Sequence, residues 1–194
     1  MLALMITAAM AGAPSGWKIT EADYNGCELA LGPAESDGVV PMRAECVWPD
    51  VTLDRFKTVM SNWEAHDEVF TTVAESRIQR TEADRALVYQ KHQNGGINDR
   101  EILLWMKHET VDGYDRYGWT RATGETLTAC SDCVLTTRSD GYWQAKAEGT
   151  GVRVVHLLAY DPGGSVPGFI IRWFQTSGLE TNVDELHAYL KKGS

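Results

Sequence analysis

The stretch YDPGGSVPGF, residues 160–169, joins the last predicted strand of the chain to its last predicted helix. Asp161 can end a strand, and the proline and two glycines that follow it turn the chain. Ser165 can then cap a helix that begins near Val166, with Pro167 in its first turn. The stretch therefore predicts a strand, a tight turn and a helix in direct succession.

The helix after this turn is predicted to span residues 166–191 and to be amphipathic. Gly178 and its polar neighbours are expected to bend or interrupt it. Its apolar side consists of Phe169, Ile170, Trp173, Leu186 and Leu190. Such a helix must bury its apolar side, and the concave face of a sheet is the partner that the rest of the chain offers.

Strands dominate the chain before this helix. Apolar and polar residues partly alternate in segments 17–20, 27–31, 39–48, 69–80, 85–92, 99–109, 114–122, 141–147 and 152–160. After the third segment, Thr52 can cap a helix that runs to about Trp63. Polar, glycine-containing turns separate the later strands, which indicates an antiparallel meander and an α+β fold.

Four segments of the chain, taken in order, resemble the START (StAR-related lipid-transfer) family. They are LDRFKTVMSNW (53–63), NDREILL (98–104), RSDGYW (138–143) and YDPGGSVPGF (160–169). The last is the most specific, and the second carries Glu101 where the family has Asp. The resemblance covers about residues 17–192. In it the chain is similar to a bacterial-type single-domain START protein, within the helix-grip (SRPBCC/Bet v 1-like) superfamily.

The resemblance implies a helix-grip fold, in which a curved antiparallel sheet wraps around a long C-terminal helix and encloses a hydrophobic cavity. It implies one START-like lipid-binding domain over residues 14–194. The cavity of such a domain holds one hydrophobic lipid, a sterol, a phospholipid or a related molecule. The protein would carry this lipid between membranes or to a partner.

Strand alternation predicts which side chains face this cavity. In segment 85–92 neither set of alternate residues is clearly the inner one; we choose Leu87 and Tyr89, with Ala86 and Val88 as the alternative. Tyr89, His108 and His156 are the candidates for bonding a ligand headgroup. The predicted lipid-binding residues are Leu87, Tyr89, Ile102, Leu104, Met106, His108, Trp119, Trp143, His156, Phe169, Ile170 and Trp173. A close-packed core without a cavity is the alternative explanation of this pattern.

The charge of the chain limits its partners. Its 194 residues carry 27 acidic and 18 basic side chains, a formal net charge of −9. Nucleic acids and anionic membranes both attract clustered Lys and Arg, so we expect no nucleic-acid binding and only transient membrane contact. We also expect a monomer without cofactors.

The four cysteines form two pairs in the sequence. Cys27 and Cys46 fall on strands expected to be neighbours, and Cys130 and Cys133 lie in a polar loop. Two local disulfides would fit an exported protein, whereas free thiols and a metal site are the alternatives. A zinc site would need two more ligands, and no second CxxC or HxxxH motif supplies them.

Residues 1–13 (MLALMITAAMAGA) are apolar and end in a sequence similar to a signal-peptidase site. They are either the remnant of a signal peptide or an N-terminal helix that packs on the domain. The first interpretation predicts a periplasmic or secreted protein, and a cytoplasmic location is the alternative.

Catalysis is the main alternative to lipid carriage, because related helix-grip proteins include cyclases and hydrolases. The five histidines show no HxxxH or HxH spacing, and no GxSxG motif or phosphate-binding loop occurs. We therefore expect a carrier and not an enzyme. A small-molecule cyclase or hydrolase and a cargo-free interaction domain remain the alternative functions.

Overall fold

A curved sheet of ten strands forms the body of the protein in the computed structural model, which describes residues 12–93, 97–127, 130–167, 170–171 and 174–192. The strands are β1 (Lys18–Tyr24), β2 (Cys27–Leu31), β3 (Met42–Trp48), β4 (Val73–Thr81), β5 (Ala86–His92), β6 (Arg100–Val111), β7 (Tyr114–Arg121), β8 (Val134–Leu135), β9 (Arg138–Glu148) and β10 (Gly151–Asp161). Their order is β1-β2-β3-β10-β9-β7-β6-β5-β4, and the short β8 pairs with β6. All neighbours on this path are antiparallel, and the sheet is open because β1 and β4 end the path without pairing to each other.

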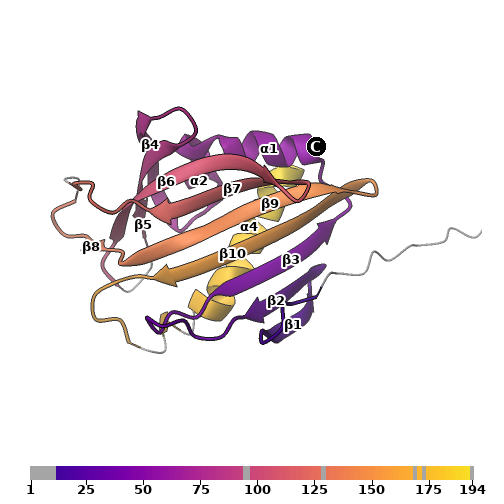
Figure 1. The fold of residues 1–194 in the computed structure, drawn as a ribbon, viewed down its shortest axis with the longest axis horizontal. Coiled ribbons are helices and arrows are strands. Elements are labelled where there is room, and N and C mark those ends of the chain that lie inside the picture. Colours follow the sequence, from indigo (N-terminus) through magenta and orange to yellow (C-terminus); the bar gives the residue numbers. More distant parts are fainter. Residues whose placement is uncertain (1–11, 94–96, 128–129, 168–169, 172–173, 193–194) are drawn as a thin grey trace, which may run out of the picture.

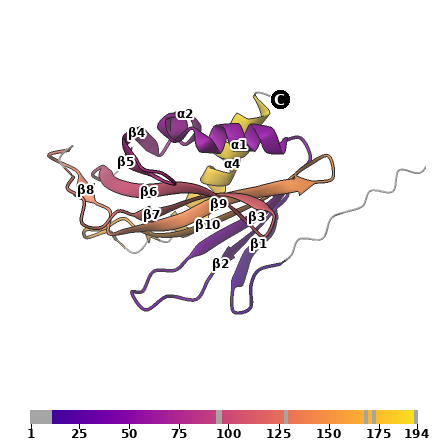
Figure 2. The ribbon, with the colours of Figure 1, turned by 45° about the horizontal axis from the view of Figure 1, so that its top comes forward.

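The helices lie on one face of this sheet (Figures 1 and 2). Between β3 and β4 the chain forms α1 (Leu53–Ser61), a 3-10 turn η1 (Trp63–Ala65) and the short α2 (His66–Val69). Thr52 caps α1 as predicted, because its side chain accepts a hydrogen bond from the Arg55 backbone N–H at 3.2 Å. The chain ends in a π-helical turn η2 (Phe174–Gly178) followed by α4 (Leu179–Lys191).

The C-terminal helix changes from π-helical to α-helical geometry at Gly178, where the sequence predicts a bend or an interruption, and it does not begin at Val166. Val166 and Pro167 are not helical, and the first helical residues described are Ile170 and Ile171. The Ile170 N–H donates to the Pro167 carbonyl oxygen at 2.9 Å. Ser165 thus belongs to the turn and does not cap a helix beginning at Val166.

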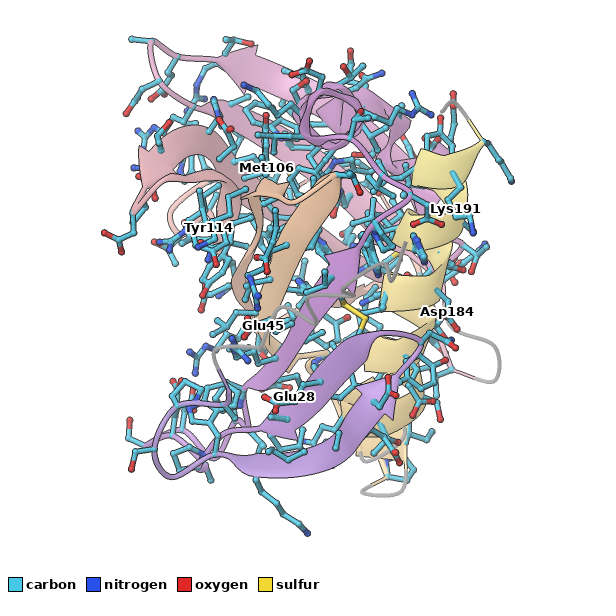
Figure 3. The ribbon with its side chains drawn as sticks, turned by 90° about the vertical axis from the view of Figure 1, so that its right-hand side faces the viewer. Glu28, Glu45, Met106, Tyr114, Asp184 and Lys191 are labelled. Atoms are coloured by element: carbon cyan, nitrogen blue, oxygen red, sulfur yellow. A yellow bond between two sulfur atoms is a disulfide. The ribbon has the colours of Figure 1, made fainter. Side chains whose placement is uncertain are left out.

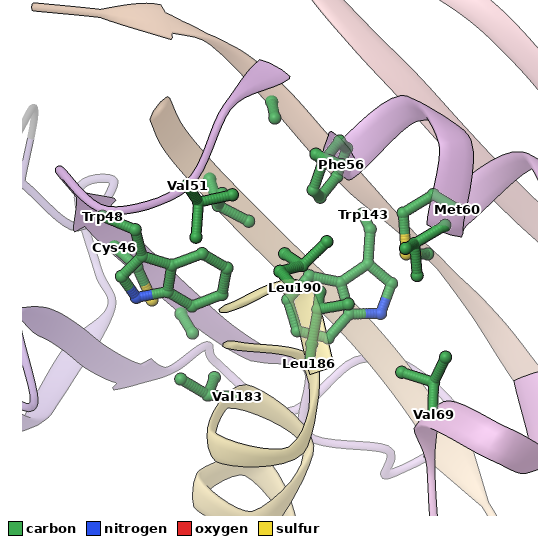
Figure 4. Close-up of a cluster of buried hydrophobic side chains, with 14 of the residues drawn as sticks. Cys46, Trp48, Val51, Phe56, Met60, Val69, Trp143, Val183, Leu186 and Leu190 are labelled. Atoms are coloured by element: carbon green, nitrogen blue, oxygen red, sulfur yellow. The ribbon is translucent and has the colours of Figure 1, made fainter. Parts of the chain in front are cut away.

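The core of the protein is the contact between α4 and the concave face of the sheet. Leu179, Val183, Leu186 and Leu190 are buried on one side of α4, at the three- and four-residue spacing of a helix. Figure 4 shows Val183, Leu186 and Leu190 on the side of α4 that faces Trp48 and Trp143. This confirms the prediction for Leu186 and Leu190; Phe169 and Trp173 lie outside the described residues.

The outward side of α4 is joined to the first hairpin. Tyr24 at the end of β1 donates its hydroxyl to Asp184 Oδ2 at 2.6 Å, and Asn25 Nδ2 donates to Asp184 Oδ1 at 3.1 Å. Figure 3 shows Asp184 on α4 beside this edge of the sheet. The turn of the β1–β2 hairpin thus holds the middle of the helix.

Both pairs of cysteines form disulfides, which confirms the predicted pairing. Cys27 on β2 lies opposite Cys46 on β3, with a Cα–Cα distance of 4.0 Å, and Cys130 is bonded to Cys133 in the loop before β8. Residues 1–11, which make up most of the predicted signal remnant or N-terminal helix, lie outside the described residues. Within the described part of the chain, no helix is long and apolar enough to span a membrane.

We expect Leu186→Ala to lower the free energy of unfolding by about 2–5 kcal/mol, because it removes a fully buried side chain and leaves a cavity. Leu186 is 0% exposed, whereas Ile19 on β1 is 47% exposed, so Ile19→Ala is the control and should cost less than about 0.5 kcal/mol. Urea unfolding followed by circular dichroism measures both. Equal losses in the two variants would contradict this description of the core.

Candidate ligand-binding cavity

A cavity of about 140 Å³ lies between the concave face of the sheet and the C-terminal helix. Strands β3 to β7, β9 and β10 supply one wall, and α2 and the loop after it supply another. The helical cover comes from Phe174 and Gly178 of η2 and from Leu179, Thr181 and Asn182 of α4. Leu179 is therefore part of both the core and the cavity wall.

Strand pairing brings the cavity residues of the sheet together. Met106 on β6 lies opposite Trp119 on β7, and Trp143 on β9 lies opposite His156 on β10. Alternate residues of a strand share a face, so Leu104 lines the cavity together with Met106. The structure places five residues of the predicted set on the cavity wall: Leu104, Met106, Trp119, Trp143 and His156.

The prediction that Leu87 and Tyr89 face inward is wrong. Both pack on the outer face of the sheet with Leu103, and the Tyr89 hydroxyl donates to Glu101 at 3.3 Å. The alternative set is the inner one, because Ala86 and Val88 pack with Ile102, Leu104 and Met106. Alternation failed here because the outer face is apolar too and is covered by arginines: Arg77 stacks over the Tyr89 ring at 4.5 Å.

Three other predicted residues also lie away from the cavity wall. Ile102 is buried on the inner face beneath it, as part of the cluster with Ala86 and Val88. His108 lies further along β6, with its side chain 43% exposed and its Nε2 3.1 Å from Asp115 Oδ1. Ile170 is half-buried and does not line the cavity, and Phe169 and Trp173 lie outside the described residues.

The predicted set lacks several polar residues of the cavity, among them His66, Gln90 and His92. Gln90 and His92 continue the alternation of Ala86 and Val88 along β5, so the alternative set would have included them. His66 begins α2 and follows a 3-10 turn, and no periodic pattern marks such a position.

The cavity is electrically neutral at pH 7. Among the described residues that line it, none is Asp, Glu, Lys or Arg. Burial lowers the pKa of His66, His92 and His156 to about 4 each, so all three imidazoles are uncharged. The arrangement can hold an apolar molecule and can form hydrogen bonds to an uncharged polar group.

Hydrogen bonds and ring contacts fix the positions of these imidazoles. The His156 ring stacks on Trp143 with centroids 3.8 Å apart, and its Nδ1 lies 3.1 Å from the Tyr142 carbonyl oxygen. His92 Nε2 lies 3.1 Å from Gln90 Oε1, and the Gln90 amide donates to Ser76 Oγ at 3.2 Å. The histidines are therefore held by neighbours on the sheet.

The turn of YDPGGSVPGF lies against β8. Gly163 has a φ of +70°, and a Cβ at this position would lie 2.2 Å from the Leu135 carbonyl oxygen. A side chain is thus excluded both by backbone conformation and by contact. Among the described residues of the motif, Tyr160 lines the cavity, and the others form the turn that leads to the helical cover.

One group of residues in the described part of the chain lies close enough together to bind a metal ion. A Glu101 oxygen and the sulfurs of Cys130 and Cys133 lie within 4.8 Å of one another. Because the two sulfurs are bonded to each other, they are not available as thiolate ligands.

The buried imidazole of His156 predicts a pH dependence of stability. Its pKa is lower in the folded protein than in the unfolded chain, so between about pH 6.5 and 4 only the unfolded chain binds the proton. Stability is lost as the pH falls through this window, by at most about 1.4 kcal/mol per pH unit from this residue. We expect His156→Gln to have a flatter profile, measured by urea unfolding at pH 7.5 and 4.5. The same slope in both proteins would contradict the assignment.

Comparison with known proteins shows what this architecture is similar to. No family model and no curated protein matches the sequence. Among solved structures, a STAR-related lipid transfer protein from Xanthomonas axonopodis (fragment 25–204) matches 91% of this chain and 99% of its own, with a TM-score of 0.79 and 17% identity. Human STARD10 matches 93% of this chain and 75% of its own, with a TM-score of 0.80 and 16% identity.

A more distant structure, the Zhui aromatase/cyclase from Streptomyces sp. R1128, matches 78% of this chain and 94% of its own, with a TM-score of 0.55 and 8% identity. The two StAR-related structures thus match more of this chain, and with higher TM-scores, than the aromatase/cyclase does. The chain therefore has the helix-grip fold of the START (StAR-related lipid-transfer) domains.

Proposed function

We propose that the protein binds one hydrophobic lipid in the cavity and carries it between membranes or to a partner. The observation that carries the proposal is the uncharged cavity between the sheet and α4, lined by Met, Leu and aromatic side chains. Burial of apolar surface stabilises such a complex by about 25 cal/mol for each Å² removed from water. The proteins of the same fold that are named for lipid transfer support this proposal.

The cavity must enlarge to hold a whole lipid. Its volume of about 140 Å³ is smaller than the roughly 300–1,000 Å³ of sites for drug-sized ligands. We propose that η2 and the turn before it move outward, because η2 covers the cavity and both precede the well-packed part of α4. The π-helical geometry of η2 supports this, since π-turns are frequent at functional sites.

Two glycine pairs, Gly95-Gly96 and Gly163-Gly164, and the turn at residues 111–113 are the candidates for hinges or moving loops. We propose Gly163 and Gly164 as the hinge, because both have positive φ angles and precede the C-terminal helix. Gly95 and Gly96 lie outside the described residues. The turn at Asp112 and Gly113 joins β6 to β7, whose end residues Val111 and Tyr114 are paired, and its residues do not line the cavity.

A cyclase or hydrolase activity is the second candidate, and the buried imidazoles are the observation in its favour. A general base works best with a pKa near the working pH. The pKa of about 4 for His66 and His156 is well below pH 7, which favours a binding role for these rings. A cargo-free interaction domain is less well supported, because its interior would be filled.

We further propose a periplasmic or secreted location, a monomeric state and transient membrane contact. The two disulfides support an oxidising compartment. The net charge of −9 argues against lasting attachment to anionic lipid. Leu135, which is 49% exposed on β8 beside the Gly163 turn, is a candidate for brief contact with a bilayer.

Blocking the cavity should abolish lipid uptake. Leu158 on β10 lines the cavity, whereas the next residue toward the N-terminus, Leu157, points to the other face of the sheet. We expect Leu158→Trp to take up at least tenfold less lipid from an extract of the host's membranes than the unchanged protein, because the indole occupies the binding volume. Solvent extraction and mass spectrometry of the repurified protein measure the bound lipid.

Leu157→Trp is the matched control and should load like the unchanged protein. Thermal unfolding of both variants verifies that they are folded. An unchanged protein that takes up no lipid, or a Leu158→Trp variant that loads normally, would rule out this cavity as the lipid site.

A further inference from the structure

Two buried imidazoles of the cavity each have one ring nitrogen without a partner. His66 is 6% exposed and His156 is 2% exposed, and both line the cavity. The Nε2 atoms of both rings are buried and have no hydrogen-bond partner. They are the only such side-chain atoms among the described residues of the cavity wall. A buried polar atom left unpaired is costly, so these two positions call for a ligand group.

The partner of the other ring nitrogen decides what kind of group can bind. His156 Nδ1 lies 3.1 Å from the Tyr142 carbonyl oxygen, and a carbonyl can only accept. Nδ1 therefore carries the proton, and in the neutral ring Nε2 is a bare acceptor. Stacking on Trp143 holds the ring in this orientation.

His66 has the same arrangement on the opposite wall. Its ring is hydrogen-bonded to the backbone carbonyl of Met60, and because Nε2 has no partner, Nδ1 is the donor in that bond. Nε2 of His66 is thus a second acceptor. α2 and β10, which are distant in the sequence, thus each carry an unpartnered acceptor on a residue that lines the cavity.

Several other polar groups of the cavity already have partners. His92 and Gln90 bond to each other. Trp119 Nε1 donates to Ser139 Oγ at 3.2 Å, and Thr181 Oγ1 donates to the Ser177 carbonyl oxygen at 2.7 Å. Among the fully buried side-chain atoms of the described wall, the two that lack a partner are therefore both acceptors.

We propose that the cavity selects an uncharged lipid whose polar end carries a hydroxyl group. This hydroxyl donates a hydrogen bond to Nε2 of His156. Nε2 of His66 is the acceptor for a second donor of the lipid. This inference rests on the proposed function and specifies the class of ligand. A phosphate diester or a carboxylate has acceptors but no donor, and no described residue that lines the cavity is a cation. Arg100, which is buried opposite His92 on the same face of the sheet, is not among these lining residues, and its guanidinium donates to the Asn98 carbonyl oxygen. Burying such an anion would be strongly unfavourable.

Three probes with the same chain and different ends test the proposal on the delipidated protein at pH 7.5. They are 1-decanol, its methyl ether and sodium decanoate, and isothermal titration calorimetry measures the affinity of each. The alcohol alone has an uncharged donor. We expect it to bind at least tenfold more tightly than either the ether or the carboxylate.

His156→Phe identifies the residue responsible, because phenylalanine keeps a ring beside Trp143 and removes the acceptor. We expect the preference for the alcohol over the ether to fall below threefold in this variant. His108→Phe is the matched control, since His108 lies outside the cavity, and it should retain the full preference. If His156→Phe fails to fold, the preference for the alcohol over the ether is measured in His66→Phe instead.

The outcomes separate the two proposals. Binding of all three probes with equal affinity, or tightest binding of decanoate, would overturn the inference and leave the lipid-binding function standing. So would a preference for the alcohol that survives in both cavity variants. Failure of the unchanged protein to bind any of the three probes would overturn both.

Discussion

The packing of α4 against the concave face of the sheet is the contact on which the rest of the structure depends. Leu179, Val183, Leu186 and Leu190 bury one side of the helix against residues such as Trp48 and Trp143. The same helix, with η2 before it, also covers the cavity. The C-terminal part of the helix thus stabilises the fold, while its N-terminal part and η2 bound the ligand space. Motion that admits a ligand must be confined to the second region, since moving the first would expose the core.

On β3 and β10, strand alternation keeps the charged side chains away from the cavity. On β3 and β10 the inner residues include Met42 and His156, whereas Arg43, Glu45 and Arg153 point to the other face. There Arg153 donates to both Glu45 and Glu148, and Arg43 donates to Glu45, so the buried charges are paired. Figure 3 shows Glu45 on the side of β3 away from α4. The described residues that line the cavity thus include neutral imidazoles and no charged side chain, which is why the proposed ligand is uncharged. Arg100 is buried on the inner face of β6 opposite His92 but is not among the lining residues.

Much of this architecture was predictable, and the failures have physical causes. YDPGGSVPGF predicted the turn into the last helix because proline and glycine constrain the backbone locally. The alternation of β6 placed Leu104 and Met106 correctly, since charged residues mark its outer face. The same reasoning failed for β5, because arginines cover its apolar outer face and the residues on both faces of this strand are therefore buried. His66 could not be predicted, because a residue between a 3-10 turn and a one-turn helix follows no period.

A crystal structure of the protein after exposure to a lipid extract of its host would test the central claim most directly. We predict continuous electron density for one molecule along the wall formed by Leu104, Met106 and Trp143. Its polar end should lie within hydrogen-bond distance of His156 Nε2, and η2 should be displaced outward. A cavity that keeps its volume of about 140 Å³ and contains only water after such exposure would contradict it.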